Sequence, residues 1–352
     1  MNIERMAMLA ALNTVKPALA TKDLIEELAH VWFDGKTITA YNDADLGIQA
    51  PFDAPFTGGI RGNLLLGLLV NSRARDILIE PADEGQMLLK AAKVRVKLAV
   101  LGEDRSVWKF PKVNMKGTFD VDDAFVTALR SVLIAVGNDT SIPEKLGVTL
   151  VPNKKKDLWF YTTDSKSIAS ALCPMPKGAA VADRVILPTA FCEQVLRCCA
   201  KGGFMEITDN HAVAGNGDGV LIYTRLVDPS EKPLDFTNII NKNMQFPEKA
   251  EFEIPGKLEL ALERVMVLLD GMDGEVVTIS IEKGVMTLEV ECEGRGHLKD
   301  TIVVPDDVPA ISVKIDPALL KRGLDLSMEM AIGKDAAALF GGSFTYLCST
   351  RG

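Results

Sequence analysis

The sequence is poor in the residues from which catalytic and metal sites are built. Its 352 residues include three histidines and six cysteines, and no two cysteines are spaced as C-x-x-C. Zinc sites use such spacings, so we predict no metal and no other cofactor. There is also no G-x-S-x-G or H-E-x-x-H motif, and no nucleophile has an evident histidine partner. These absences predict a protein that is not an enzyme.

Long apolar runs are also missing. No stretch of 18 apolar residues occurs, and Glu4 and Arg5 stand in a helical pattern where a leader would be apolar. We therefore expect no membrane partner and a cytoplasmic protein with reduced thiols. Cys198 and Cys199 end a predicted helix, which favours a packing role for both.

What the chain does contain is internal repetition. Three times a short amphipathic helix is followed by strand-like segments, a second helix rich in apolar residues, and more strands. The large period is about 115–130 residues and the half-period about 60, and such self-similarity fixes the architecture before any site is considered. The second helices show the repeat best, at 60–69, 187–196 and 315–324. Three domains of two half-repeats predict a curved, pseudo-symmetric molecule, with a closed ring as one form.

Local signals define the elements. Asp34-Gly35 predicts a hairpin turn, and strands are predicted at 76–80 and 86–101. Asp316 and Pro317 are predicted to cap and begin the last helix. Residues 102–117 and 229–247 are predicted linkers, and Lys154–Lys156 a solvated hairpin tip. Helical windows lie at 3–16, 61–75, 122–136, 188–201, 256–269 and 316–327, and within the second window the helix itself is predicted over about 61–71.

Charge is distributed unevenly over these elements. The formal net charge is −9, which by itself argues against nucleic acid. The six helical windows nevertheless hold 12 basic and 8 acidic residues, a net +4, against −13 for the rest. The bias favours helices that face a polyanion, but lysine and arginine are also good helix formers, so composition leaves both interpretations open.

Ordered motifs add a resemblance to a known family. The segment 34–48 resembles D-G-x-L-x-L-x-A-x-D-x-x-x-G-I of the bacterial DNA polymerase III β subunit, the β sliding clamp, although Tyr41 replaces a small residue. Segment 158–169 is similar to the family's L-x-L-x-A-T-D-G-H-R-L-A, and 184–188 and 226–236 resemble the same domain. At the C-terminus only Arg351 matches V-M-P-M-R-L. The divergence suggests a virus- or plasmid-borne member.

The resemblance implies an α+β fold of three similar DNA-clamp domains, each of two helix-plus-strands half-repeats, that assemble as a ring. The domains would span 1–115, 116–248 and 249–352. Two chains would form a homodimer ring around double-stranded DNA, in the bacterial cytoplasm or in a host cytoplasm if the protein is virus-encoded. The implied function is a processivity factor for DNA replication, which tethers a replicative polymerase. An assembly ring that kept the fold without sliding is the alternative.

Three sets of site residues follow from the resemblance. DNA would be contacted by helix-borne cations and one loop lysine: Lys22, Arg61, Arg73, Arg75, Arg130, Arg197, Lys201, Lys257, Arg264, Lys321 and Arg322. Peptides of the polymerase and clamp loader would enter a pocket of Thr163, Ser165, Lys166, Ser167, Ile168, Leu234, Asn238, Ile239, Tyr346, Leu347, Cys348, Ser349, Thr350 and Arg351. The dimer interface would use Val96, Leu98, Val267 and Leu268.

Two replacements alter the predicted pocket. The family's Gly-His-Arg becomes Ser165-Lys166-Ser167, and its Met-Pro-Met becomes Cys348-Ser349-Thr350. Because the substituted residues are more polar, we expect the pocket to prefer a more polar peptide than the usual Gln-x-x-Leu-Phe type.

Overall fold

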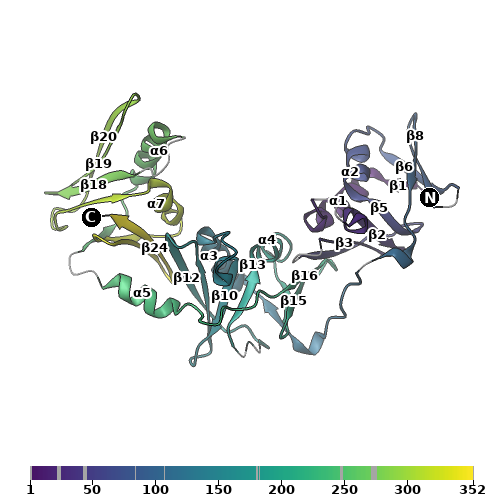
Figure 1. The fold of residues 1–352 in the computed structure, drawn as a ribbon, viewed down its shortest axis with the longest axis horizontal. Helices are drawn as coiled ribbons and strands as arrows, with labels where there is room; N and C mark the ends of the chain where they lie inside the picture. The colour runs from purple at the N-terminus through teal and green to yellow at the C-terminus, as the bar shows by residue number, and fades with distance from the viewer. Residues whose placement is uncertain are drawn as a thin grey trace. The chain divides into compact units, whose positions relative to one another are not determined.

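A computed structural model describes residues 2–21, 25–42, 46–83, 85–106, 108–179, 181, 183–245, 249–270 and 276–351. The chain follows one order of elements six times: a strand, a helix and three more strands (Figure 1). This is the predicted half-repeat. The first two copies are β1 (Asn2–Glu4), α1 (Arg5–Val15), β2 (His30–Asp34), β3 (Thr37–Tyr41) and β4 (Gly47–Pro51), then β5 (Thr57–Arg61), α2 (Gly62–Val70), β6 (Asp76–Pro81), β7 (Gln86–Ala91) and β8 (Val94–Ala99).

The other four copies follow the same order. The third and fourth are β9 (Thr118–Val121), α3 (Asp123–Val132), β10 (Gly147–Pro152), β11 (Asp157–Thr163) and β12 (Ser167–Pro174), then β13 (Val185–Pro188), α4 (Thr189–Cys198), β14 (Gly203–Ile207), β15 (His211–Gly215) and β16 (Leu221–Arg225). The fifth and sixth are β17 (Ala250–Glu253), α6 (Leu258–Leu269), β18 (Val277–Glu282), β19 (Val285–Cys292) and β20 (Gly296–Val303), then β21 (Ile311–Ile315), α7 (Pro317–Leu324), β22 (Glu329–Ile332), β23 (Ala336–Gly341) and β24 (Phe344–Arg351).

The opening strand of each half-repeat pairs with the neighbouring half-repeat. β1 pairs with β6 and β5 with β2. The same exchange joins β9 to β14 and β13 to β10, and then β17 to β22 and β21 to β18. Two consecutive half-repeats therefore exchange their opening strands, and neither of them completes its sheet alone.

Closing strands join these pairs to one another. β4 of the first half-repeat pairs with β16 of the fourth, and β12 of the third pairs with β24 of the sixth. Both contacts are antiparallel. The closing strands β8 and β20 lie at sheet edges, and among the described strands neither pairs beyond its own neighbour β7 or β19.

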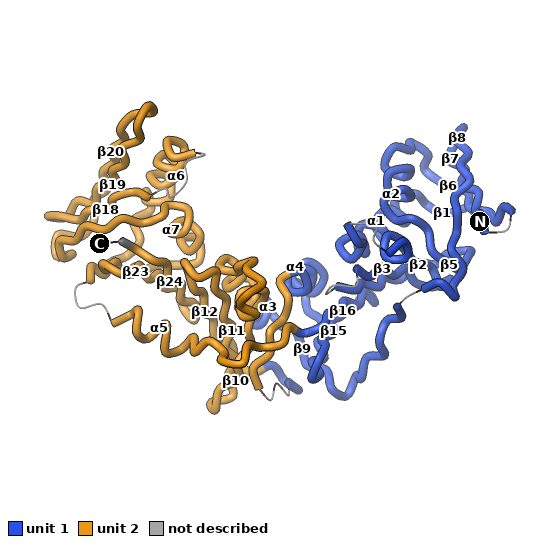
Figure 2. The backbone as a smooth tube through the Cα atoms, viewed as in Figure 1, with its two compact units in different colours: residues 1–126, 176–180, 190–226 blue, residues 127–175, 181–189, 227–352 orange. Residues whose placement is uncertain are grey.

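The chain forms two compact units (Figure 2). Unit 1 comprises residues 1–126, 176–180 and 190–226, and unit 2 comprises residues 127–175, 181–189 and 227–352. Both units draw on residues 116–248, so the predicted middle domain contributes to each. The domain boundaries after residues 115 and 248 remain a prediction.

Helices bury one face against their sheets. α6 shows the pattern, because Leu258, Ala261, Leu262, Val265 and Leu269 recur at helical spacing and are all buried. Each of the leucine and valine side chains contributes roughly 1.5–3 kcal/mol on burial. The opposite face carries the charged residues of the helix. Among the described residues, no helix combines the length and apolar character that a bilayer span requires.

Local predictions were confirmed where turn chemistry is explicit. Gly35 adopts φ +93°, and the Asp34 carboxylate accepts hydrogen bonds from the Lys36 and Thr37 amides at 2.9 and 2.6 Å. Asp316 accepts the Ala318 amide at 2.9 Å and so caps α7. Lys154–Lys156 form an exposed turn between β10 and β11.

Two predicted elements were wrong in extent. The strand predicted over 86–101 is the hairpin β7–β8, which turns at Ala92 with φ +54°. The linker predicted over 229–247 contains a helix, α5 (Phe236–Met244), whose Asp235 caps it by accepting the Asn238 amide. By contrast, the second helix, predicted over about 61–71, is found at Gly62–Val70.

A hydrogen bond from Tyr346 of β24 helps to hold α7 against the sheet. The Tyr346 side chain is fully buried, and its hydroxyl group donates to the Leu319 carbonyl at 2.8 Å. We expect Tyr346→Phe to lower the free energy of unfolding by about 1 kcal/mol, because one buried hydrogen bond is removed while the ring packing is kept. Urea denaturation measures it. Tyr223→Phe is the control, since the Tyr223 hydroxyl has no hydrogen bond with a described residue; equal effects of the two variants would contradict the assignment.

Candidate functional site

A cavity of about 290 Å³ lies in unit 2, where β12 pairs with β24. Its walls come from the β11–β12 turn, from residues 234–243 and from the start of β23. Most of the predicted pocket residues line it, namely Thr163, Ser165, Lys166, Ser167, Ile168, Leu234, Ile239, Leu347, Cys348 and Ser349. The β12–β24 pairing thus brings together lining residues that are far apart in sequence, and residues 234–243 complete the wall.

The remaining predicted residues do not line the cavity. Asn238 lies on α5 outside the lining, and Thr350 turns its hydroxyl group to the Gly333 carbonyl at 2.9 Å. Tyr346 faces α7, on the opposite side of the sheet from Leu347, because successive strand residues point to opposite faces. Burial raises the pKa of Tyr346. The side chain of Arg351 is outside the described part of the chain.

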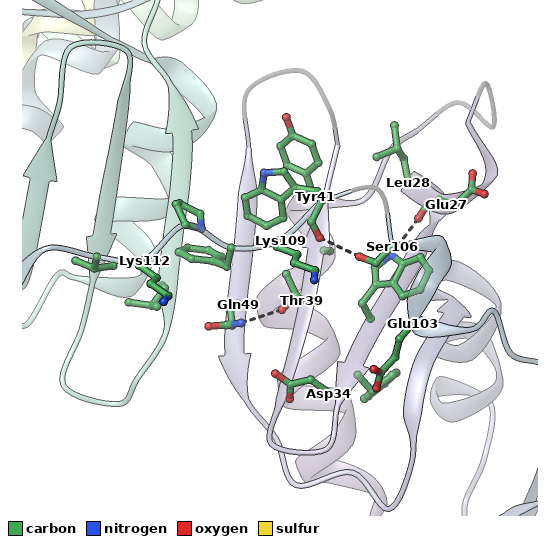
Figure 3. Close-up of a pocket in the computed structure, with 18 residues that line it drawn as sticks. Glu27, Leu28, Asp34, Thr39, Tyr41, Gln49, Glu103, Ser106, Lys109 and Lys112 are labelled. Carbon is green, nitrogen blue, oxygen red and sulfur yellow. Dashed lines mark hydrogen bonds between the residues drawn. The ribbon is translucent and has the colours of Figure 1, made fainter.

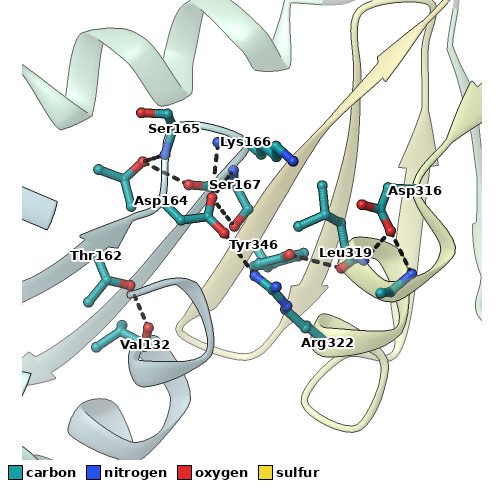
Figure 4. A network of polar contacts seen from close by, with 12 residues as sticks. Val132, Thr162, Asp164, Ser165, Lys166, Ser167, Asp316, Leu319, Arg322 and Tyr346 are labelled. Atoms are coloured by element: carbon teal, nitrogen blue, oxygen red, sulfur yellow. Dashed lines mark hydrogen bonds and ion pairs between the residues drawn. The ribbon is translucent and has the colours of Figure 1, made fainter. Parts of the chain in front are cut away.

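The turn at the cavity mouth is organised by one carboxylate (Figure 4). Asp164 accepts the amides of Lys166 and Ser167 at 2.9 and 2.7 Å and the Ser167 hydroxyl at 2.9 Å. Its second oxygen accepts from the Arg322 guanidinium of α7 at 2.8 Å. The arrangement fixes the turn and leaves Ser165 in the left-handed region at φ +75°.

The back wall contains residues that the sequence analysis did not predict. These are Ile142, Lys145, Asn243, Asp335 and Ala336. Their segments carry no pattern that indicates a pocket, and α5, which supplies Asn243, falls where a linker was predicted. Ile240 and Met244 of α5 also pack on Ala331, Ala338 and Leu347. Only the fold could identify this wall.

An ion pair supports the back wall. The Lys145 ammonium, with 8% of its side chain exposed, lies 2.8 Å from Asp139. Hydrogen bonds from Lys145 and from Ser141 hold the pKa of Asp139 well below its ordinary 3.8. Cys348 is buried beside the cavity, and burial raises the pKa of its thiol. The thiol is therefore an apolar wall group rather than a nucleophile.

Fewer of the predicted DNA-binding residues lie in helices than expected. Arg130, Arg197, Arg264, Lys321 and Arg322 do lie in helices. By contrast, Arg61 ends β5, Arg73 and Arg75 follow α2, Lys201 follows α4, and Lys257 precedes α6. The error for Arg73 and Arg75 has a simple cause, since α2 stops at Val70. Lys22 lies outside the described residues.

Several of these cations are already paired. Arg264 pairs with Asp300, and Lys321 lies 2.5 Å from Glu263. Arg322 pairs with Asp164, as described above. In unit 1 the Arg197 guanidinium donates to the carbonyls of Asn13 and Thr14 at 3.2 and 2.8 Å.

A second group has exposed side chains and makes no ion pair with any residue that the structure describes; it comprises Arg73, Arg75, Arg130, Lys201 and Lys257.

The predicted interface residues lie on or near the two closing strands that have an open edge, β8 and β20. On β8, Val96 is half-buried, but Leu98 is 3% exposed and packs inside its own unit. On α6, Val267 is 78% exposed and Leu268 half-buried. Val303, at the end of β20, is 83% exposed. Leu98 is thus a core residue of the single chain, whereas Val267 and Val303 are unusually exposed aliphatics.

Comparison with solved structures finds known proteins that share this fold. The chain is similar to a sliding clamp from Bartonella birtlesii, bound to griselimycin, at TM-score 0.86 and 16% identity, over 99% of this chain and 98% of that one. It is similar to the DNA polymerase III β chain of Streptococcus pneumoniae at TM-score 0.84 and 16% identity, over 99% and 98%. The Helicobacter pylori β clamp bound to a DNA ligase peptide gives 0.82 and 16%, over 100% and 99%.

Sequence comparison alone finds nothing: no protein-family model and no curated protein sequence matches the chain. The structural likeness nevertheless covers nearly the whole chain. The chain therefore has the α+β fold of the bacterial DNA polymerase III β sliding clamp, which confirms the resemblance and the fold class predicted from its motifs.

The ion pair behind the cavity gives a pH dependence. The lowered pKa of Asp139 means that its charged form stabilises the fold above its ordinary pKa of 3.8, and that this contribution is lost as pH falls below it. We expect Asp139→Asn to destabilise the protein at pH 7 and to do so progressively less below about pH 4. Urea denaturation as a function of pH measures the difference. Asp218→Asn is the control, and a constant difference at all pH values would exclude the pair as its cause.

Proposed function

We propose that the protein is a DNA sliding clamp, a non-enzymatic ring that encircles duplex DNA and tethers a replicative polymerase. The observation that carries this proposal is the pairing of closing strands. The first half-repeat pairs with the fourth and the third with the sixth, so each pairing advances by three. By the same rule the fifth, ending in β20, would pair with β8 of the next copy. Two chains joined twice in this way close a head-to-tail homodimer.

The exposed aliphatics support this closure. Val267 and Val303 stand near the edge that the rule leaves open, and exposed apolar side chains of this kind mark protein interfaces. Val96 would belong to the facing strand. Leu98, being buried in the single chain, would stiffen that strand rather than contact the partner.

A ring that slides contacts phosphates and does not read bases. An exposed cation without an ion-pair partner can contact a phosphate without first breaking an ion pair. Arg73, Arg75, Arg130, Lys201 and Lys257 are exposed and make no ion pair with a described residue. Arg264, Lys321 and Arg322 would have to leave their carboxylates to reach a phosphate. We therefore assign the larger share of DNA contact to the first group, and a smaller share to Arg61 and Arg197.

The cavity beside β24 would receive the peptide of a polymerase or clamp loader. Ile168, Leu234, Ile239 and Leu347 offer apolar anchoring, while Ser165, Ser167 and Ser349 offer polar contacts. The clamp from Helicobacter pylori, which shares the fold, was solved with a DNA ligase peptide. This supports peptide docking as a use of the fold.

The alternative is an assembly ring that does not slide on DNA. The pairing of three predicted DNA-contacting cations with carboxylates and the net charge of −9 favour it. The salt dependence of DNA residence separates the two, because only the clamp depends on phosphate contacts.

The first test concerns closure. We expect Val267→Lys to yield monomers in analytical ultracentrifugation, because a lysine at the apolar interface forgoes roughly 1.5–3 kcal/mol of burial and desolvates a charge. Leu260→Lys, on the same helix and 56% exposed, is the matched control and should leave the dimer intact. If the Val267→Lys variant still forms dimers at low protein concentration, the dimer interface lies elsewhere.

The second test concerns DNA. We expect Arg73→Glu with Arg130→Glu to shorten residence on DNA and to flatten its logarithmic salt dependence, by about 0.9 for each phosphate that the protein no longer neutralises. Surface plasmon resonance over a salt series measures both. Lys154→Glu with Lys155→Glu changes the same charge at the hairpin tip and should have little effect. Unchanged salt dependence in the arginine variant would favour the assembly ring.

The third test concerns the peptide. We expect Leu234→Asp to raise the Kd of a cognate polymerase tail at least about ten-fold, because a carboxylate replaces a half-buried apolar anchor of the cavity. Fluorescence anisotropy measures it. Met328→Asp, at a site 80% exposed and outside the cavity lining, is the control. If both variants bind equally well, the peptide docks elsewhere.

A further inference from the structure

A second and larger cavity lies in unit 1 and has no part in the function proposed above. It encloses about 690 Å³ between the sheet face of β2, β3 and β4 and residues 103–106 and 108–113, which lie over that face (Figure 3). This volume is within the usual range of ligand pockets. Gln49 of β4 and Leu221 of β16 both line it, and they are paired across the β4–β16 junction. The cavity therefore adjoins one junction between half-repeats, as the cavity of unit 2 adjoins the other.

Two indole rings form much of its apolar wall. Trp108 stacks on Tyr41 with ring centroids 4.4 Å apart and lies against Gly47, where a Cβ atom would come within 2.6 Å of the ring. Trp32 lies in the same way against Gly59, at 2.9 Å. The Trp32 indole nitrogen donates to the Glu27 carbonyl at 3.2 Å. Both rings are half-buried, and the absence of a side chain at Gly47 and Gly59 leaves room for them to lie against the strands.

Some of the charged side chains around the cavity already have partners, and others do not. The carboxylate of Glu27 pairs with Arg105 at 2.5 Å, and that of Asp34 is occupied by its own turn. Lys109 and Lys112 are exposed, and neither makes an ion pair with a described residue. Figure 3 shows Lys109 projecting over the strands that carry Thr39 and Gln49.

Glu103 also makes no ion pair with a described residue, and Asp34 keeps its negative charge although its oxygens accept hydrogen bonds. Lys109 and Lys112 are thus the lining cations, and both are left without a carboxylate partner among the described residues.

The chain itself shows what this sheet face accepts. Residues 108–114 run across it with no helix or strand of their own, and they place Trp108 and Phe110 in an aromatic cluster with Tyr41 and Tyr223. The Trp108 and Tyr223 centroids lie 5.3 Å apart. An irregular segment is thus already docked here through aromatic anchors, and open volume remains beside it.

We propose that this cavity is a second docking site, which binds a short peptide of a partner protein by placing an aromatic or large aliphatic side chain against Trp32 and Trp108 and an acidic side chain against Lys109 and Lys112. The segment 108–114 supplies the precedent for a chain bound through aromatic side chains, and Lys109 and Lys112, which are exposed and have no ion-pair partner among the described residues, are the groups that acidic flanks would contact. The site is independent of the cavity at β24.

Fluorine NMR of protein labelled with 5-fluorotryptophan tests this proposal. The chain has three tryptophans, and Trp159 on β11 lines neither cavity, so its signal is an internal control. The probe is the capped peptide Ser-Asp-Asp-Phe-Leu-Asp-Ser, compared with a version in which every Asp is Lys and one in which Phe and Leu are Ser. We expect the acidic apolar probe to shift the Trp32 and Trp108 signals and leave that of Trp159 unchanged.

Variants then locate the site. Lys109→Glu with Lys112→Glu should weaken the acidic probe at least about five-fold, and exposed lysines can be changed without loss of the fold. Leu234→Asp should leave the Trp32 and Trp108 shifts unchanged, which separates this site from the peptide pocket of the proposed clamp. The proposal is overturned if neither signal moves at about 1 mM probe, if the lysine-containing probe binds equally well, or if Leu234→Asp rather than the lysine variant abolishes the shifts.

Discussion

The structure depends on strand pairing between half-repeats. No half-repeat completes a sheet alone, because its opening strand is contributed to its neighbour, as β1 to β6 and β5 to β2. Buried backbone amides and carbonyls must be paired, so the exchange makes the two members of a pair interdependent. The closing strands extend the same constraint from pair to pair through β4–β16 and β12–β24. Among the described closing strands, β8 and β20 are the ones that this pairing leaves with an open edge.

The candidate sites lie where this pairing brings distant segments together. β12 and β24 carry the two sides of the unit 2 cavity, and Asp164 holds both the β11–β12 turn and Arg322 of α7. The cavity of unit 1 adjoins β4–β16 in a similar way. Concave sites at junctions between elements are the usual places for ligands, because the backbone there is rigid while side chains come from several segments.

Much of this was predictable from sequence. The repeat, the Asp34-Gly35 turn and the Asp316 cap have local chemical causes, since φ values and caps are set by neighbouring residues. The β24 cavity was predicted only through motifs shared with a family. Its back wall was not, because Lys145 and Asn243 reach it through tertiary contacts that leave no periodic signal. The cavity of unit 1 was missed for the same reason, since Trp32 and Trp108 converge only in the fold.

Helix ends and strand partners were the least predictable features. Arg73 and Arg75 fall after α2 because the helix ends at Val70, where apolar periodicity gives way to Asn-Ser-Arg. α5 was missed because its apolar face is narrow and flanked by prolines. Ion pairs such as Arg322 with Asp164 join residues 158 positions apart, and no local pattern encodes them. These ion pairs determine which arginine and lysine side chains remain available to bind a polyanion.

Topological trapping on DNA tests the central claim most directly. The protein is diluted to favour open chains, mixed with nicked circular DNA, concentrated to close the ring, and passed through a gel-filtration column at high salt. A closed ring predicts co-elution with the circle and release when the same DNA is cut once, because only threading survives the screening of phosphate contacts. Equal retention on circular and linear DNA, or none on either, would contradict a ring that encircles DNA.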